Sequence, residues 1–406
     1  MIARIKAGSL SVRSQVRIMG IITALSLLGD GLMYVILPLY WEEMGLTAYW
    51  QIGVLLSVNR FIRIPLNPII AKLYHHISFR MGFAAALSLA VLTTLGYGWL
   101  QGFVLLFAAR CLWGAAWTFF RLGAYFAIPQ WSNNEDRGYL FGLHKGITRV
   151  GALIGMAAGA LMIEPFGITF VLTLFAVLTF AVFPFVLLMN GRLTVSESSS
   201  SSPAEVQKVP VENKAGLAAI FVTAVLLTIT FDGVLKSTLP LLVENVLDGS
   251  FDVLSLSLGA AAVSSFLQLF RGLLEPILSP LAGRIIDQTR RRSFLLGSFL
   301  ITASLSSLFS GLADQLITFL LIVVVLQLSA VFLEVFILTK AADQPDSSSR
   351  VKVMTNLSIL QDIGAAAGPF LAYLLFAVLN TAQLYALVAA MLIVPGIFWV
   401  TRKNSR

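Results

Sequence analysis

Long apolar runs separated by short polar segments form the main pattern of this sequence. A run of about 20 apolar residues, folded as an α-helix, is long enough to cross the hydrocarbon core of a bilayer. The pattern therefore predicts an all-α membrane protein with twelve transmembrane helices. The expected spans are 18–40, 50–74, 79–100, 102–128, 138–163, 166–190, 215–242, 254–282, 293–313, 315–341, 351–378 and 382–401.

The second half of the chain repeats polar positions of the first half. Asp30-Gly31 in the first span returns as Asp232-Gly233 in the seventh, followed in both copies by a proline and a glutamate at equal spacing. A repeat that holds over several helices indicates two parallel halves around a central site. The predicted organisation is a six-helix bundle at 1–190, a flexible serine-rich cytoplasmic linker at 191–214 and a second six-helix bundle at 215–406.

Composition and charge place the chain in a membrane and set its orientation. Hydrophobic residues make up 58% of the chain and charged residues 12%, with a mean hydropathy of +0.87, which is outside the range of soluble domains. Among the segments outside the predicted spans, Lys and Arg fall in the N-terminal arm, the even-numbered loops and the C-terminal tail, whereas the odd-numbered loops hold none. The positive-inside rule then predicts an integral plasma-membrane (cell inner membrane) protein with both termini cytoplasmic.

Several function classes are disfavoured by the same features. The net charge of +8 follows from the topology, and without a basic soluble domain it indicates no nucleic-acid partner. The first apolar run is too long for a signal peptide and contains Asp30, so we expect it to be retained. The single Cys111 excludes an intramolecular disulfide, and three histidines supply no metal cluster. We expect a monomer without a cofactor and without enzymatic activity.

Asp30 is the first candidate functional residue, because a carboxylate near the middle of a spanning helix is costly and rare. Such a group usually faces a water-filled cavity, pairs with another group or exchanges a proton. Asp232 occupies the matching position, although Lys236 one turn further on offers local neutralisation. A structural contact between helices is the alternative interpretation of both residues.

Cations and aromatic residues at membrane depth complete the candidate site. In the second span, the spacing of Asn59 and Arg63 places both on one stripe, flanked by Arg60. In the fourth span, Arg110 and Arg121 project from nearly one face at two depths. The candidate substrate-binding residues are Asp30, Tyr34, Asn59, Arg60, Arg63, Trp113, Trp117, Arg121, Asp232, Lys236, Arg271 and Glu334. Bulky packing is an equally good interpretation of the two tryptophans.

Three motifs resemble those of the major facilitator superfamily, and within it the twelve-helix drug and metabolite proton antiporters. Gly283, Asp287, Arg291 and Arg292 are similar to the cytoplasmic signature G-x-x-x-D-x-x-x-R-R, whose first-half copy is degenerate here. From this resemblance we expect these residues to act in gating and in contacts between the halves. Leu106, Arg110 and Gly114 resemble the motif of the fourth helix. Gly142, Gly151, Gly155 and Gly159 fit the spacings of the antiporter motif in the fifth helix, with Met156 in place of its proline.

The resemblance implies a central cavity lined by helices 1, 4, 7 and 10, and contacts between the halves made by helices 2, 5, 8 and 11. On that arrangement we expect Asp362 to pair with Arg63 or Arg60, and Arg149 to pair with Glu275. Arg121 and Glu334 occupy matched positions with opposite charges. We expect them to form a cytoplasmic gate that closes in one state and opens in the other.

Three functions are compatible with the sequence. The first is a proton-coupled exporter of a small anionic, zwitterionic or amphipathic organic molecule by alternating access. In it, Asp30 gains and loses a proton, Arg110 biases the pKa of Asp30, and the substrate competes for the same space. The second is a proton symporter or facilitator that imports an anionic metabolite, suggested by the many arginines at membrane depth. The third is a polytopic membrane protein that does not transport, such as an enzyme or a receptor-like protein. This function is disfavoured, because the sequence contains no catalytic cluster and no soluble domain.

Overall fold

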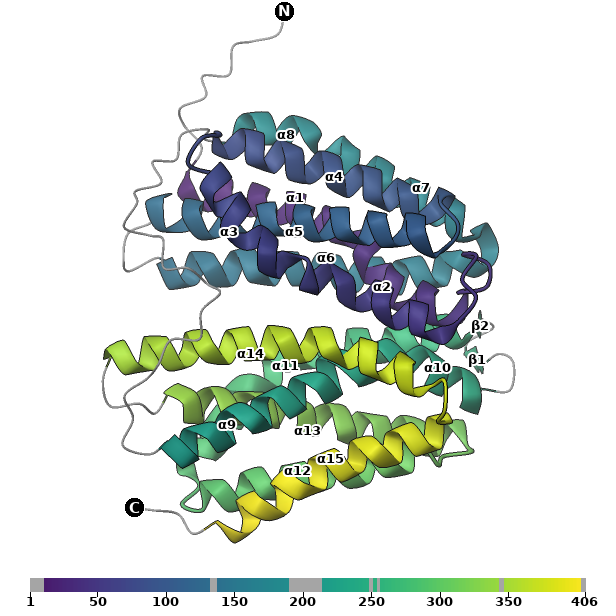
Figure 1. Cartoon of the computed structure of the whole chain (residues 1–406), viewed down its shortest axis with the longest axis vertical. Coiled ribbons are helices and arrows are strands. Elements are labelled where there is room, and N and C mark those ends of the chain that lie inside the picture. The colour runs from purple at the N-terminus through teal and green to yellow at the C-terminus, as the bar shows by residue number, and fades with distance from the viewer. Residues whose placement is uncertain are drawn as a thin grey trace, which may run out of the picture. The chain divides into compact units, whose positions relative to one another are not determined.

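A computed structural model describes residues 11–131, 137–189, 214–247, 251–253, 256–342 and 347–402 (Figure 1). In the first part of the chain the helices are α1 (Val12–Leu39), α2 (Tyr49–Phe61), α3 (Arg63–Leu73), α4 (Phe79–Trp99), α5 (Phe103–Trp131), α6 (Arg137–Phe166), α7 (Ile168–Ala181) and α8 (Phe183–Leu188). In the second part they are α9 (Lys214–Leu227), the π-helix η2 (Thr228–Leu235), α10 (Lys236–Val246), α11 (Ala260–Gln288), α12 (Arg292–Ser310), α13 (Leu316–Ala342), α14 (Ser347–Leu375) and α15 (Thr381–Thr401).

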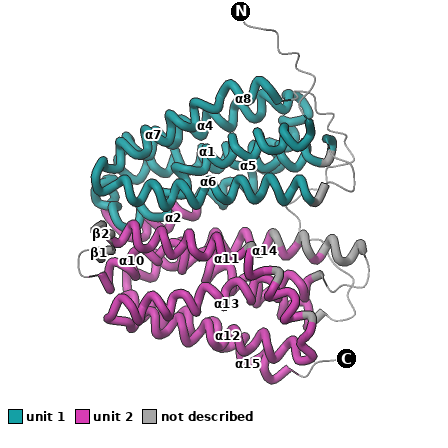
Figure 2. Tube along the Cα trace, turned by 180° about the vertical axis from the view of Figure 1, so that it is seen from behind, with its two compact units in different colours: residues 1–46, 58–203 teal, residues 47–57, 204–406 magenta. Residues whose placement is uncertain are grey.

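The chain divides into two compact units (Figure 2). Unit 1 contains residues 1–46 and 58–203, and unit 2 contains residues 47–57 and 204–406. The first half of α2 belongs to unit 2, where Gly53 lies against the backbone of Pro369 and Phe370 on α14. Most of the linker predicted at 191–214 lies outside the described residues.

Glycines of α6 bring this helix into backbone contact with α1 in unit 1. A Cβ atom added at Gly151 or Gly155 would overlap the backbone of Ala24 or Leu28 on α1, and one added at Gly159 would overlap the side chain of Leu32. Gly142, the first glycine of the series, has no neighbour within 4 Å in that direction. Three of the four glycines in the antiporter-like series therefore allow α1, which carries Asp30, to pack closely against α6.

The repeat of this packing in unit 2 joins α14 to η2. A Cβ added at Gly368 would overlap Gly233, next to Asp232, and one added at Gly364 would overlap Thr228. Buried hydroxyl groups fix the same region, because Tyr373 donates to the carbonyl of Ser237 (2.7 Å) and the Tyr385 hydroxyl lies 2.8 Å from that of Thr238. The segment that carries Asp232 is thus held by close packing and hydrogen bonds within its own unit.

Among the described residues, ten helices or helix pairs are long and apolar enough to cross a membrane. An eleventh candidate is α11, which bends by 44° between Glu275 and Ile277, where the sequence has a proline and so lacks one backbone N–H donor. Ile359–Leu375 of α14 is a shorter apolar segment at the predicted eleventh span. The structure confirms the predicted all-α architecture, and adds a small antiparallel hairpin of β1 (Phe251–Val253) and β2 (Leu256–Leu258) before α11.

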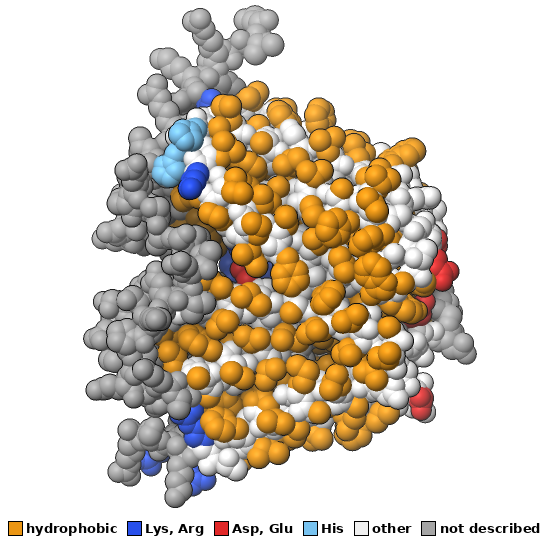
Figure 3. Space-filling model, in the orientation of Figure 1, with side chains coloured by type: hydrophobic (Ala, Val, Ile, Leu, Met, Phe, Trp, Pro, Cys, Tyr) orange, Lys and Arg blue, Asp and Glu red, His pale blue; other side chains and the backbone are white. Residues whose placement is uncertain are grey.

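Apolar side chains cover the surface that each unit shows to the viewer in Figure 3. Exposed examples include Leu92, Val104, Phe180, Ile317 and Val394, all on helices that qualify as spans. Soluble proteins rarely expose so much contiguous apolar surface, whereas lipid tails solvate it. The outer surface therefore agrees with an integral membrane protein.

Candidate functional site

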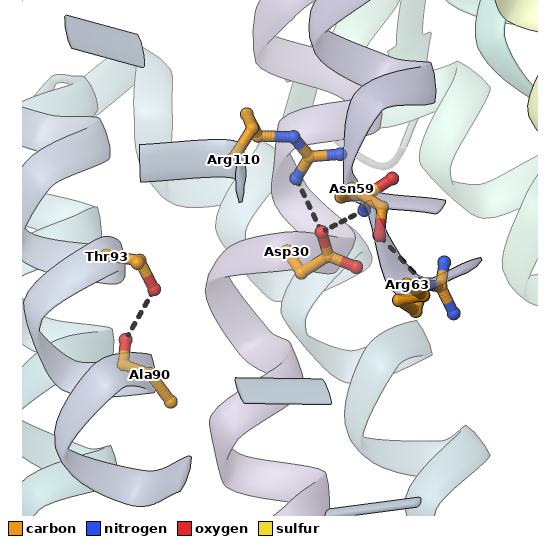
Figure 4. Close-up of polar contacts among 6 residues, drawn as sticks. All are labelled: Asp30, Asn59, Arg63, Ala90, Thr93 and Arg110. Carbon is orange, nitrogen blue, oxygen red and sulfur yellow. Dashed lines mark hydrogen bonds and ion pairs between the residues drawn. The ribbon is translucent and has the colours of Figure 1, made fainter. Parts of the chain in front are cut away.

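Asp30 lies in the middle of α1 and binds two side chains from other helices of unit 1 (Figure 4). Its Oδ1 accepts a hydrogen bond from Arg110 Nη1 at 2.5 Å and another from Asn59 Nδ2 at 3.4 Å. The Arg110 side chain is completely buried, and that of Asp30 is 14% exposed. Among the described residues no donor contacts the second carboxylate oxygen, Oδ2. Two donors from other helices thus hold one oxygen of this carboxylate.

The helices that surround Asp30 position its partners. Arg110 projects from α5, and its guanidinium carbon lies 5.8 Å from the centre of the Tyr97 ring on α4. Asn59 lies in the last turn of α2 and is only 3% exposed, and its own carbonyl accepts a hydrogen bond from Arg63 Nε at 2.8 Å. The Asn59 side-chain oxygen is buried without a partner among the described residues.

The other candidates of unit 1 have varied surroundings. Tyr34, one turn beyond Asp30, is buried, and Trp113 is buried within the bundle, while Trp117 and Arg60 are half-buried. Arg121 donates a hydrogen bond through Nη2 to Asn67 Oδ1 of α3 at 3.1 Å. Its expected gate partner, Glu334, belongs to the other unit, so the gate stays a prediction.

Asp232 lies on η2 in unit 2 and forms a looser ion pair. Its Oδ1 lies 3.4 Å from Nη2 of Arg271, which comes from α11. Arg271 also donates through Nη1 to the carbonyl of Phe231 at 3.2 Å, and its guanidinium carbon lies 5.8 Å from the Phe231 ring centre. The ionic partner of Asp232 is therefore Arg271 rather than the neighbouring Lys236.

A small cavity of about 20 Å³ lies beside this pair. Thr228, Phe231, Asp232, Arg271, Glu334 and Gln361 provide its polar and aromatic lining. The structure thus brings three of the predicted substrate-binding residues of unit 2 into one wall. Arg149, Glu275 and Asp362 have predicted partners in the other unit, so their pairing stays a prediction as well.

The signature that begins at Gly283 lies partly within the end of α11 and is only partly described. A Cβ atom added at Gly283 would meet no neighbour within 4 Å, Arg291 is exposed and Arg292 is half-buried. The side chain of Asp287 lies outside the described part of the structure. The expected role of this loop in the conformational change stays a prediction.

Sequence reasoning missed two aromatic residues that contact the buried arginines. Tyr97 lies on α4, a helix with almost no charge, and Phe231 directly precedes Asp232. A tyrosine within a strongly apolar span is the one available signal for Tyr97, because a buried hydroxyl needs polar surroundings. No pattern in the sequence distinguishes Phe231 from the many other phenylalanines.

Comparison with known proteins gives the family. The model of the Major Facilitator Superfamily matches residues 19–276. The human (Homo sapiens) chromaffin granule amine transporter is 24% identical over 164 residues, which cover 40% of this chain and 30% of that protein. The rat (Rattus norvegicus) protein of the same name is 26% identical over 115 residues, or 28% of this chain and 22% of its own. The chain thus matches less than a third of the length of these curated relatives.

Solved structures share the fold over nearly the whole chain. A bacterial homologue of the human lysosomal transporter Spinster, in an inward-facing unoccupied conformation, has a TM-score of 0.73 at 14% identity, covering 97% of this chain and 96% of its own. The nucleoside transporter NupG has a TM-score of 0.74 at 11% identity, covering 95% and 98%. Because the family model matches more than half of the sequence, this chain belongs to the Major Facilitator Superfamily and is a membrane transporter of that type.

Proposed function

We propose that this protein is a proton-coupled secondary active transporter that exports a small organic molecule by alternating access. The observation that carries the proposal is the buried pair of Asp30 and Arg110, with one carboxylate oxygen engaged and the other without a donor among the described residues. A carboxylate within the membrane loses the solvation of its charge, which is energetically unfavourable. Such a group is therefore expected to have a function, and alternate binding of a proton and a guanidinium is one that suits Asp30.

The chemistry assigned to each residue follows from its contacts. When Asp30 is ionised, Oδ1 binds Arg110 and Asn59, which neutralise and orient it. A proton that arrives on Oδ2 removes the negative charge and weakens the attraction to Arg110. Substrate binding and protonation then favour different states of one site, which is the requirement for exchange. The close packing of α1 on the glycines of α6, at the spacings of the antiporter motif, supports the antiporter subtype.

The test separates proton binding from transport. Infrared difference spectra recorded on adding a compound found by a thermal-shift screen should contain a carboxylic-acid C=O band that is absent in the Asp30→Asn variant. In proteoliposomes with an imposed pH gradient, Asp30→Asn should abolish gradient-driven flux of any compound found by a thermal-shift screen. Glu164→Gln, which removes an exposed carboxylate of the same unit, is the matched control. Unchanged coupling in the Asp30→Asn variant at several pH values would refute the proposal.

Import of an anionic metabolite is the second candidate. The observation in its favour is the set of arginines on α2, α3 and α5 of unit 1, namely Arg60, Arg63, Arg110 and Arg121, which suits carboxylate or phosphate recognition. An importer coupled to protons would accumulate its substrate when the outside is acidic, whereas an exporter would release it. The direction of flux under one imposed gradient therefore distinguishes the two candidates.

A further inference from the structure

Two buried oxygen atoms next to the pair of Asp30 and Arg110 have no hydrogen-bond partner among the described residues. They are the hydroxyl of Tyr97 on α4 and the side-chain oxygen of Asn59 on α2. Both residues also contact the pair, because Asn59 donates to Asp30 (Figure 4) and the Arg110 guanidinium carbon lies 5.8 Å from the centre of the Tyr97 ring. An unpaired buried polar atom is unfavourable, so each such atom in a native site needs an explanation.

The packing of unit 1 directs one face of α4 towards the pair. Thr94, one turn before Tyr97, packs so closely against Gly29 that a Cβ atom added at Gly29 would overlap its side chain. Residues three positions apart project from the same face of a helix. Tyr97 therefore lies on the side of α4 that meets α1 beside Asp30. Its hydroxyl interacts electrostatically with the Arg110 guanidinium, although no hydrogen bond of normal geometry joins the two groups.

Protonation of Asp30 changes the surroundings that Arg110 requires. Arginine does not release its proton in proteins, so the guanidinium stays charged when the carboxylate becomes neutral. The Arg110 side chain is completely buried, and a buried charge that loses its counter-ion is strongly destabilising. Further hydrogen-bond acceptors can compensate part of that loss. The Tyr97 hydroxyl is such an acceptor, and the face of its ring also attracts cations.

No second carboxylate that the structure describes in unit 1 can replace Asp30 as the counter-ion. The other described carboxylates of this unit are exposed, namely Glu42, Glu43 and Glu164. Tyr34 and Cys111 also interact with Arg110, but both are neutral near pH 7. The helices α6 and α7 add no charge here, because α6 meets this part of α1 through the backbone of Ala152 and α7 contains no charged residue.

We propose that Tyr97 is a positioning residue that holds Arg110 when Asp30 is protonated. With Asp30 ionised, the guanidinium binds Oδ1 of the carboxylate and the Tyr97 hydroxyl is unpaired, as in this structure. With Asp30 protonated, the guanidinium donates a hydrogen bond to the Tyr97 hydroxyl. Tyr97 thus provides the second of two positions for one guanidinium. The inference deepens the proposed function and rests on it, because it concerns the same carboxylate.

A double-mutant cycle tests this assignment without transport. Equilibrium unfolding of the purified full-length protein is measured at pH 8 for Tyr97→Phe, which removes only the hydroxyl, with Asp30 intact and with Asp30→Asn in place of the protonated carboxyl. With Asp30 intact, the folding equilibrium constant should stay unchanged or rise, because the lost hydroxyl was unpaired. In the Asp30→Asn background it should fall about tenfold, because a hydrogen bond to a charged group is lost.

Two further variants make the cycle decisive. Tyr125→Phe is the matched control, because it removes the hydroxyl of an exposed tyrosine on α5, and its effect should be the same in both backgrounds. Asp30→Ser supplies the neutral background if Asp30→Asn does not give monodisperse protein.

Raman spectra report directly on the hydroxyl. The intensity ratio of the tyrosine Fermi doublet changes when the hydroxyl accepts a strong hydrogen bond. The contribution of Tyr97 is the difference between spectra recorded with and without the Tyr97→Phe substitution. In the neutral background this ratio should move towards that of an acceptor. Equal effects of Tyr97→Phe on folding in both backgrounds, or an unchanged doublet ratio, would overturn the inference.

The two proposals fail in distinguishable ways. If the effect of Tyr97→Phe depends on the charge of Asp30 but no flux follows a pH gradient, the proposed function is wrong and the second position of Arg110 stands. If Asp30 couples flux to protons but Tyr97→Phe acts equally in both backgrounds, only the inference about Tyr97 is wrong.

Discussion

Replacing Arg110 with methionine is the most direct perturbation of the buried pair. Methionine fills part of the space of the side chain and removes its charge, so Asp30 loses the donor that lies 2.5 Å from Oδ1. Removing one partner of a buried pair typically costs about 3–5 kcal/mol. The loss of stability cannot exceed the cost of making Asp30 neutral by protonation. For an ordinary aspartate at pH 7 that cost is about 4 kcal/mol. We therefore expect Arg110→Met to lower the free energy of unfolding by about 3–4 kcal/mol.

The sign of the pH dependence follows from the same reasoning. In the variant the folded state holds a proton on Asp30, whereas the unfolded chain releases it at neutral pH. The folded state then binds more protons, so stability falls as the pH rises. As the pH falls from 7 to 5, the difference in the free energy of unfolding between Arg110→Met and the wild-type protein should shrink by about 1.4 kcal/mol per pH unit. The wild-type protein, with its pair intact, should lack this steep dependence.

The assay is equilibrium unfolding in mixed micelles with a denaturing detergent, followed by the fluorescence of the seven tryptophans. Asp30→Asn alone should also be destabilising, because a buried guanidinium does not lose its proton. The double variant should recover part of the loss, with a coupling energy of about 2–4 kcal/mol. Arg17→Met, which removes an exposed arginine near the start of α1, should change stability by less than about 0.5 kcal/mol. If Arg110→Met and Asp30→Asn each lower the free energy of unfolding by less than about 1 kcal/mol and show no coupling energy, the pair does not stabilise the fold.

Three further predictions address packing and the contact between halves. Gly155→Ala should lower the free energy of unfolding by about 1–3 kcal/mol in the same assay, because the added methyl overlaps the backbone of Leu28. Gly142→Ala should be neutral, and equal effects of the two substitutions would contradict the packing argument. Arg121 and Glu334 should show coupling in transport rate, measured by a double-mutant cycle with a charge swap, and additive effects would exclude the gate. The two expected bridges between the halves, one from Asp362 and one from Arg149, should each show coupling in stability, with additivity as the opposing result.

Much of the fold was predictable because membrane helices require long apolar runs, which are visible in the sequence. Ten of the predicted spans correspond to described helices that are long and apolar enough to cross a membrane, whereas α11 bends and the apolar part of α14 is short. The packing role of Gly151, Gly155 and Gly159 was also predictable, since small residues at helical spacing permit close approach. The helix against which they pack, α1, was not, because a spacing does not specify its partner.

The partners of charged groups were harder to predict than their depth. The sequence indicated that Asp30 and Arg110 act together, and the structure places them in contact. For Asp232 the sequence suggested Lys236, four residues on, as a neutralising neighbour. In the structure, Nη2 of Arg271 from α11 lies 3.4 Å from this carboxylate. A spacing within one helix does not show which residue of another helix approaches a charged group.

The counter-ions of the two repeated carboxylates have a consequence for how such proteins change over evolution. Asp30 is matched by an arginine on the fourth span, whereas Asp232 is matched by one on the eighth, which is the counterpart of the second span. The acid kept its place in the repeat, but the base that neutralises it did not. Any guanidinium that reaches the carboxylate satisfies the same electrostatic need, so electrostatics alone does not require a particular helix to supply it. Searches for related coupling sites should therefore test for a compensated carboxylate in three dimensions, since a fixed pair of sequence positions would miss half of this molecule.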